Sequence, residues 1–152
     1  YCGYAADVSR TYPVSGTYST RQRKLYDVVL GVQKDLISAY RTGVSLVQLQ
    51  ETTVELFKCR LPLAGFKLPE AGIGAWYYHS VGHSLGLDTH DGTSRDLVLE
   101  PGMVITCEPG IYIAEENVGI RIEDDILITE KGPVNLTEKI VKDPARIELL
   151  MK

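Results

Sequence analysis

The strongest constraint on the fold is a pair of alternating apolar segments, GMVITCEPGIYIA and VGIRIEDDILIT, separated by three residues that include Glu115 and Glu116. In the second segment the isoleucines recur at even spacing, which is the period of a strand with one buried face. The pattern predicts an antiparallel hairpin that turns at Glu115 and Glu116. In that register the facing pairs are Ile113 with Val118, Ile111 with Ile120, and Glu108 with Glu123.

The predicted pairing of Glu108 with Glu123 is unfavourable by itself, because like charges directly opposite one another destabilise a sheet. A cation or a proton shared by the two carboxylates would make their interaction favourable. In the alternative arrangement, one glutamate faces solvent and the other pairs with Arg121 or Lys131. A bulge at Pro109 and Gly110 could also break the register. The two carboxylates are therefore candidates for a metal site.

The rest of the chain predicts helices and short strands. A short strand is expected over residues 1–8. Capping-box pairs, Ser19 with Gln22 and Ser45 with Gln48, predict two helices, the first reaching Thr42 and the second ending near Arg60. A loop is expected over residues 62–74, strands in the histidine-rich segment and the hairpin, and a last helix opened by Asp143 and Pro144. These elements indicate an α/β (α+β) fold.

Composition excludes several classes of protein. The chain is 44% hydrophobic and 24% charged, which fits one domain over residues 1–152. A net charge of -4 without a block of like charge argues against nucleic-acid and membrane-surface binding. Three widely spaced cysteines favour free thiols in a reducing compartment. The opening YCGYAADV resembles the middle of a strand, so we expect a chain truncated at its N-terminus.

All three histidines lie within YYHSVGHSLGLDTHDG. His79 and His83 are four residues apart, which places both rings on one side of a helix or of an extended chain. Gly82 and Gly86 disfavour the helix. His90 joins them only if the chain bends, and we expect that bend near Gly86. Alternatively, each histidine is an ordinary polar residue.

Asp7 is a third candidate carboxylate, for which pairing with Arg10 is the simpler explanation. With Asp7, however, four segments stand in a recognisable order: ADVSRTYPV, HSVGHSLGLDTHD, PGMVITCEPGIYI and GIRIEDD. In these segments the sequence resembles the catalytic domain of Xaa-Pro aminopeptidases (aminopeptidase P), with prolidase as the nearest relative. The resemblance implies the pita-bread fold, in which helices pack outside a curved antiparallel sheet that carries two divalent metals.

The resemblance also implies roles for single residues. The metal ligands would be Asp7, His83, Glu108 and Glu123, holding two ions of Mn²⁺, Co²⁺ or Zn²⁺ that activate a bridging hydroxide. Glu108 would also relay a proton. The remaining catalytic and substrate-binding residues would be His79, His90, Tyr112 and Arg121, with Arg121 fixing Glu123. A further metal aspartate of the family would precede the first residue of this chain, so one metal site is expected to be weak.

The implied activity is hydrolysis that releases the N-terminal residue from peptides with proline in the second position. A prolidase-type dipeptidase, a non-catalytic peptide-binding or protein-binding module, and an inactive fragment remain alternatives. Trp76, Tyr77 and Tyr78 could form a wall for a proline ring or simply pack in the core. The partners expected are proline-containing peptides, with a homodimer or association with the rest of the domain left open. The expected compartment is cytoplasmic or mitochondrial.

Overall fold

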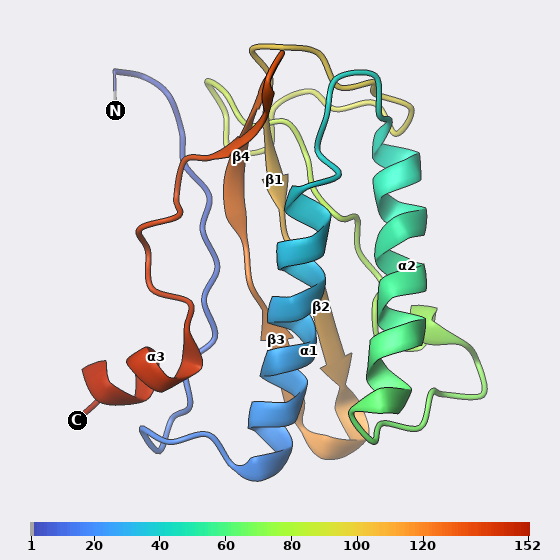
Figure 1. Cartoon of the computed structure of the whole chain (residues 1–152), viewed down its shortest axis with the longest axis vertical. Helices are drawn as coiled ribbons and strands as arrows, with labels where there is room; N and C mark the ends of the chain where they lie inside the picture. The colour runs from blue at the N-terminus through green and yellow to red at the C-terminus, as the bar shows by residue number, and fades with distance from the viewer. Residues whose placement is uncertain (1) are drawn as a thin grey trace.

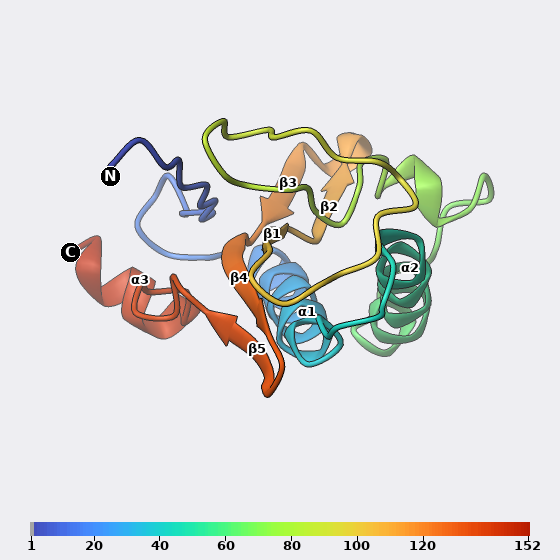
Figure 2. The same cartoon turned by 90° about the horizontal axis from the view of Figure 1, so that it is seen from above.

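The computed structural model describes residues 2–152 and has two layers (Figure 1). Helices α1 (Thr20–Ile37) and α2 (Leu46–Leu63) lie side by side on one face of the antiparallel strands. The histidine-rich segment and the N-terminal segment lie on the opposite face (Figure 2), whereas residues 97–99 pair with residues 43–46 at the start of α2. The arrangement leaves the face away from the helices to carry the chemistry.

Both long helices begin where the sequence predicts. The side chains of Ser19 and Ser45 each accept a hydrogen bond from the backbone amide three residues on. The side chains of Gln22 and Gln48 accept a hydrogen bond from the serine amides in turn, so both capping boxes are confirmed. Helix α1 ends at Ile37, earlier than expected, because Ser38 and Ala39 turn the chain. Helix α2 includes Pro62 in its last turn and ends at Leu63, so the loop predicted from residue 62 begins two residues later. The short helix α3 (Pro144–Leu150) is capped by Asp143, as predicted.

The predicted hairpin and its register are confirmed on both sides of the two glutamates. Strands β2 (Gly110–Ile113) and β3 (Val118–Arg121) pair Ile111 with Ile120, and the turn between them spans Ala114–Glu116. Strands β1 (Val104–Cys107) and β4 (Asp124–Thr129) continue the same register with Cys107 opposite Asp124. Strand β5 (Gly132–Asn135) was not predicted; it pairs with β4 at the edge, where its Pro133 is tolerated.

The hydrophobic core lies between α1, α2 and the strands. Val29, Val32 and Leu36 of α1 are fully buried with isoleucines of the strands. Gln33 of α1 is buried too, and its amide donates to the carbonyl of Ile122 where the two ladders separate. Cys2, Cys59 and Cys107 are free thiols, as predicted, and Cys107 is buried. Among residues 2–152, no helix combines the length and apolar character needed to cross a bilayer.

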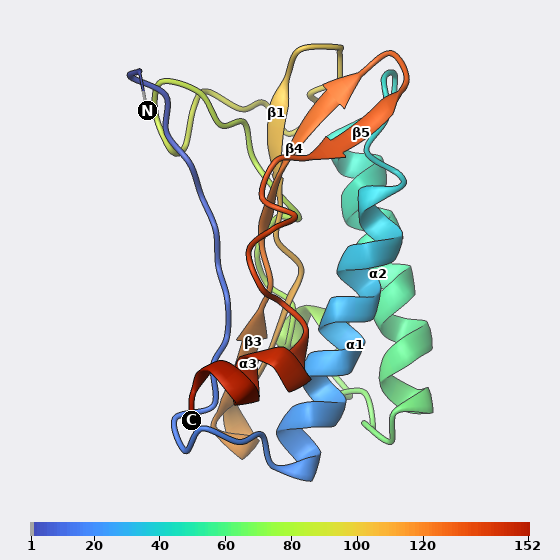
Figure 3. The ribbon, with the colours of Figure 1, turned by 60° about the vertical axis from the view of Figure 1, so that its left-hand side comes forward.

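Two strand predictions are wrong. Within the described part of residues 1–8, no strand forms; the segment runs along the sheet face away from the helices (Figure 3) and exchanges too few backbone hydrogen bonds for a ladder. The histidine-rich segment forms only one β-bridge, Ser84 with Ile105, although the carbonyls of Val81 and His83 accept hydrogen bonds from β1 and its exit. The expected bend does occur, over residues 86–90.

Candidate metal centre

Glu108 and Glu123 meet in the gap between the two ladders, on the face away from the helices. Their exposed fractions are 7% and 2%, so the alternative with one solvent-facing glutamate is wrong. Each carboxylate accepts one hydroxyl hydrogen bond: Ser9 Oγ donates to Glu123 at 2.5 Å and Thr106 Oγ1 to Glu108 at 3.3 Å. The hairpin register thus buries two acidic groups together.

The imidazole of His83 lies next to the carboxylates of Glu108 and Asp7. Its Nε2 lies 3.5 Å from Glu108 Oε1 and 3.6 Å from Asp7 Oδ2. Its Nδ1 lies 3.1 Å from the carbonyl oxygen of Ser84. A proton on Nδ1 donated to that carbonyl leaves the lone pair of Nε2 directed at the carboxylates, and this arrangement is typical of a metal-binding histidine.

Two groups of three potential ligands result, each with donor atoms within 4.8 Å of one another. One contains His83, Glu108 and Glu123; the other contains Asp7, His83 and His90. His90 comes close because of the bend after Gly86, and its ring centroid lies 4.4 Å from that of His83. His83 is common to both groups, so its imidazole links the two sets of donors into one cluster that could bind a cation.

The electrostatics of the cluster favour bound cations. Burial raises the pKa of Glu108 to about 7, and the charge of Glu123 acts in the same direction. Burial also raises the pKa of Glu123, with Asp7 adding to the shift and the Ser9 hydroxyl opposing it. Burial raises the pKa of Asp125 to about 6, and its Oδ1 is buried without a hydrogen-bond partner among the described residues. Buried acidic groups with unmet bonding capacity are the environment that a divalent cation stabilises.

Three further predicted site residues lie beside the cluster. His79 Nε2 lies 3.0 Å from the Tyr112 hydroxyl, and burial lowers the pKa of this imidazole, which favours its neutral form. Arg121 Nη1 lies 3.8 Å from Glu108. Arg121 reaches Glu123 through a hydroxyl, because its Nε donates to Ser9 Oγ at 3.1 Å and Ser9 donates onward.

Asp7 does not pair with Arg10. The Arg10 guanidinium forms its ion pair with Asp124 at 2.6 Å, and no hydrogen bond or ion pair joins it to Asp7 in the part of the chain that the structure describes. The Asp7 side chain is 25% exposed and faces His83. The simpler explanation of Asp7 is therefore wrong, and its carboxylate remains free to bind a cation.

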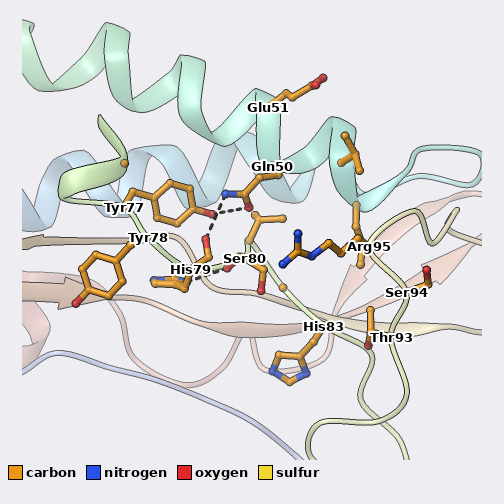
Figure 4. Close-up of a pocket in the computed structure, with 15 residues that line it drawn as sticks. Gln50, Glu51, Tyr77, Tyr78, His79, Ser80, His83, Thr93, Ser94 and Arg95 are labelled. Atoms are coloured by element: carbon orange, nitrogen blue, oxygen red, sulfur yellow. Dashed lines mark hydrogen bonds between the residues drawn. The ribbon is translucent and has the colours of Figure 1, made fainter. Parts of the chain in front are cut away.

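A groove of about 700 Å³ extends from His79 and His83 toward the N-terminal half of α2 (Figure 4). Tyr77 lines it and is held by a hydrogen bond from its hydroxyl to Gln50. Tyr78 is 68% exposed at its mouth and lies 5.1 Å from the Tyr112 ring, whereas Trp76 packs in the core. Arg95 also lines the groove. Sequence reasoning missed Gln50 and Arg95, because neither belongs to a segment with a metal-ligand pattern.

The donor set fits divalent metals. Carboxylate oxygens and imidazole nitrogen are ligands of manganese, cobalt and zinc, and no thiol is involved, since Cys107 is buried on the strand before Glu108. The buried carboxylates, the imidazole beside them and the adjacent groove fit a metal-dependent protein. The chain belongs to metallopeptidase family M24, whose model matches residues 1–130.

The relatives agree with this assignment. The chain is 40% identical to the Xaa-Pro aminopeptidase of Escherichia coli over 99% of its length, and 43% identical to intermediate cleaving peptidase 55 of Saccharomyces cerevisiae. Among solved structures, a zinc-substituted E. coli aminopeptidase P in complex with product matches with a TM-score of 0.90 and 40% identity, and yeast Icp55 with 0.90 and 42%. The fold is thus the pita-bread fold of aminopeptidase P.

These matches cover only part of each relative. The chain spans 38% of the E. coli protein and 32% of the yeast protein, while it is itself covered to 99% in both cases. The same holds for the solved chains, of which 39% and 42% are matched.

Proposed function

We propose that this chain carries the metal centre of an aminopeptidase that releases the N-terminal residue from peptides with proline in the second position. The observation that carries the proposal is the buried pair Glu108 and Glu123 beside His83, which also lines a groove of about 700 Å³. Relatives named Xaa-Pro aminopeptidase support the reaction class.

In this proposal Asp7, His83, Glu108 and Glu123 hold two divalent ions, with Mn²⁺ as the first choice and Co²⁺ or Zn²⁺ as alternatives. Such ions would polarise the scissile carbonyl and lower the pKa of a water molecule. Glu108, whose Oε1 lies 3.5 Å from His83 Nε2, would also accept and pass on the proton.

The neighbouring residues would position the substrate. His79 and Tyr112 are joined by a hydrogen bond and present one polar edge beside the metal ligands. His90, packed against His83, would hydrogen-bond to the reacting carbonyl group. Arg121 would keep Glu123 in place through Ser9. The rings of Tyr78 and Tyr112 offer an apolar surface for a proline ring.

One observation favours a prolidase-type dipeptidase as the second candidate. Arg95 is a cation on the wall of the groove, and in Figure 4 its guanidinium lies among the labelled residues between Ser80 and Thr93. An arginine at this place suits the free carboxylate of a short peptide. The two candidates differ in the length of peptide that they accept.

A peptide series separates the candidates. The Mn²⁺-treated chain would be incubated with an Xaa-Pro dipeptide, Xaa-Pro peptides of three to five residues, and matched peptides with alanine in place of proline. Release of the first residue from the longer proline peptides alone supports the aminopeptidase. Cleavage restricted to the dipeptide supports the prolidase. A chain that binds metal but cleaves none of the peptides would instead be a non-catalytic binding module.

Two properties of the whole protein also remain proposals. Relatives include a peptidase of Arabidopsis thaliana that is named mitochondrial, which supports a cytoplasmic or mitochondrial compartment. A homodimer, or association with further parts of the domain, stays a prediction that sedimentation of the purified chain would test.

A further inference from the structure

The segment that carries Asp7 has no strand ladder to hold it in place. Near Asp7, residues 4–12 bond to the sheet through the amide of Glu123, which donates to the Ser9 carbonyl at 3.0 Å, and the amide of Asp7, which donates to the Asp125 carboxylate at 3.4 Å. Beyond Arg10, the Thr11 hydroxyl accepts from the amide of Arg121 at 3.1 Å and donates to its carbonyl at 3.0 Å. A further bond joins Ala5 to Gly86. A metal ligand on such a segment needs another source of rigidity.

Arg10 supplies contacts of the required kind. Its Nη1 donates to the carbonyl of Ser9 at 2.9 Å and to the carbonyl of Glu123 at 2.5 Å. Its Nη2 and Nε donate to the carbonyls of Ile140 and Val141, each at 3.2 Å. One planar guanidinium therefore joins the Asp7 segment, the strand entry at Glu123 and the chain before α3.

Asp124 holds the guanidinium in that position. The ion pair measures 2.6 Å, and the exposed fractions of the two side chains are 4% and 0%. Lys142, Asn135 and Thr137 complete the hydrogen bonds of the Asp124 carboxylate. Although burial alone would raise it, the hydrogen bonds from Lys142, Arg10 and Asn135 keep the pKa of Asp124 below its usual value. The carboxylate is therefore a fixed, fully bonded anion next to Glu123.

We propose that Arg10, anchored by Asp124, is a positioning residue of the metal centre that fixes the distance between Asp7 and Glu123. The inference rests on the metal site of the proposed function. Arg10 is three residues from Asp7 and bonds the backbone of Glu123 itself, so a change at Arg10 alters the spacing of two ligands without touching either side chain.

Arg10→Lys is the informative variant. Lysine keeps the positive charge beside Asp124 but has one nitrogen, so it cannot hold the Ser9 and Glu123 carbonyls together with the carboxylate. Lys142→Gln is the matched control, because Lys142 bonds the same carboxylate yet makes none of the contacts to the Asp7 segment. Arg21→Lys is a second control. It removes the guanidinium of another arginine, which forms an exposed ion pair with Glu116 away from the metal ligands.

The experiment measures the Mn²⁺ dissociation constant of each chain by calorimetric titration, together with the melting temperature of the metal-free chain. Changes in the residues that orient metal ligands typically cost about 10-fold to 100-fold in affinity. We expect Arg10→Lys to weaken Mn²⁺ binding by at least about tenfold, and Lys142→Gln to lower the melting temperature while leaving the affinity within about twofold of the unsubstituted chain. Arg21→Lys also removes a two-pronged ion pair and a stacking contact with Phe66, so it should lower the melting temperature and leave the Mn²⁺ affinity unchanged.

Equal Mn²⁺ affinity in Arg10→Lys and the unsubstituted chain would overturn the inference. So would a loss of affinity in Lys142→Gln that matches its loss of stability, because binding would then follow general stability. If the unsubstituted chain binds no Mn²⁺, the metal assignment fails and the inference fails with it. That result differs from the first two, which leave the proposed function intact.

Discussion

Glu108 and Glu123 lie opposite each other in the gap between two ladders that share one register, and both are buried. Without a cation, their mutual repulsion and burial oppose folding. Glu123→Gln removes one charge and provides an amide donor toward Glu108. The metal-free variant should be more stable than the original chain by about 1 kcal/mol, measured by urea unfolding.

The same variant should lose the stabilisation that Mn²⁺ gives to the original chain. A metal that binds only the folded state stabilises it by an amount that grows with the logarithm of the metal concentration divided by the dissociation constant, and the melting temperature rises accordingly. If Glu123→Gln lowers metal-free stability, or if Mn²⁺ stabilises it as much as the original chain, the two glutamates do not form a shared cation site.

His83 and His90 should have separable roles, although their rings are 4.4 Å apart. His83→Ala should abolish Mn²⁺ binding, since His83 belongs to both ligand groups. His90→Ala should retain binding and lose peptide cleavage. Titration calorimetry and the proline-peptide assay measure the two effects, and equal Mn²⁺ affinity in both variants would refute this division.

The stability of the metal-free chain should fall as pH rises from 4.5 to 7. Folded Glu108 keeps its proton up to about pH 7, whereas the ordinary pKa in an unfolded chain is 4.5. Between these values the folded state binds more protons, so stability decreases with increasing pH and then levels off. Melting temperatures at pH 5 and pH 7.5 test this, and the decrease should be smaller in Glu108→Gln. An equal decrease in that variant would show that other groups cause it.

Gly82 should be intolerant of a side chain. A Cβ there would lie 1.9 Å from the carbonyl oxygen of Thr106, which is backbone and cannot move aside. Gly82→Ala should destabilise the chain by about 3 kcal/mol and weaken Mn²⁺ binding by displacing His83. Gly92→Ala is the control, because nothing lies within 4 Å of its Cβ position, and its effect should stay within about 0.5 kcal/mol. Similar unfolding midpoints for the two variants would contradict the argument.

Local rules predicted the regular elements well. The capping boxes at Ser19 and Ser45 and the isoleucine alternation involve short-range patterns, and the register followed from a single assumption about the turn. Predictions failed where tertiary contacts decide. The Asp7 segment has strand-like composition, but its position depends on Arg10 and Asp124, which is 114 residues away in sequence.

The site divides in the same way. Glu108, Glu123 and His83 could be selected from motif and register, whereas Gln50 and Arg95 enter the groove only through the packing of α2 and of the loop before β1. The partner of Asp7 could not be predicted either. Arg10 is close to Asp7 in the sequence, but in the folded chain it forms its ion pair with Asp124.

The most direct test of the metal centre is the stoichiometry of Mn²⁺ binding to the 152-residue chain after chelator treatment, measured by calorimetric titration beside His83→Ala. The proposed function, in which Asp7, His83, Glu108 and Glu123 hold two ions, predicts two ions per chain. The second should bind more weakly, because three carboxylates do not balance two divalent charges. Uptake no greater than that of His83→Ala would contradict the account.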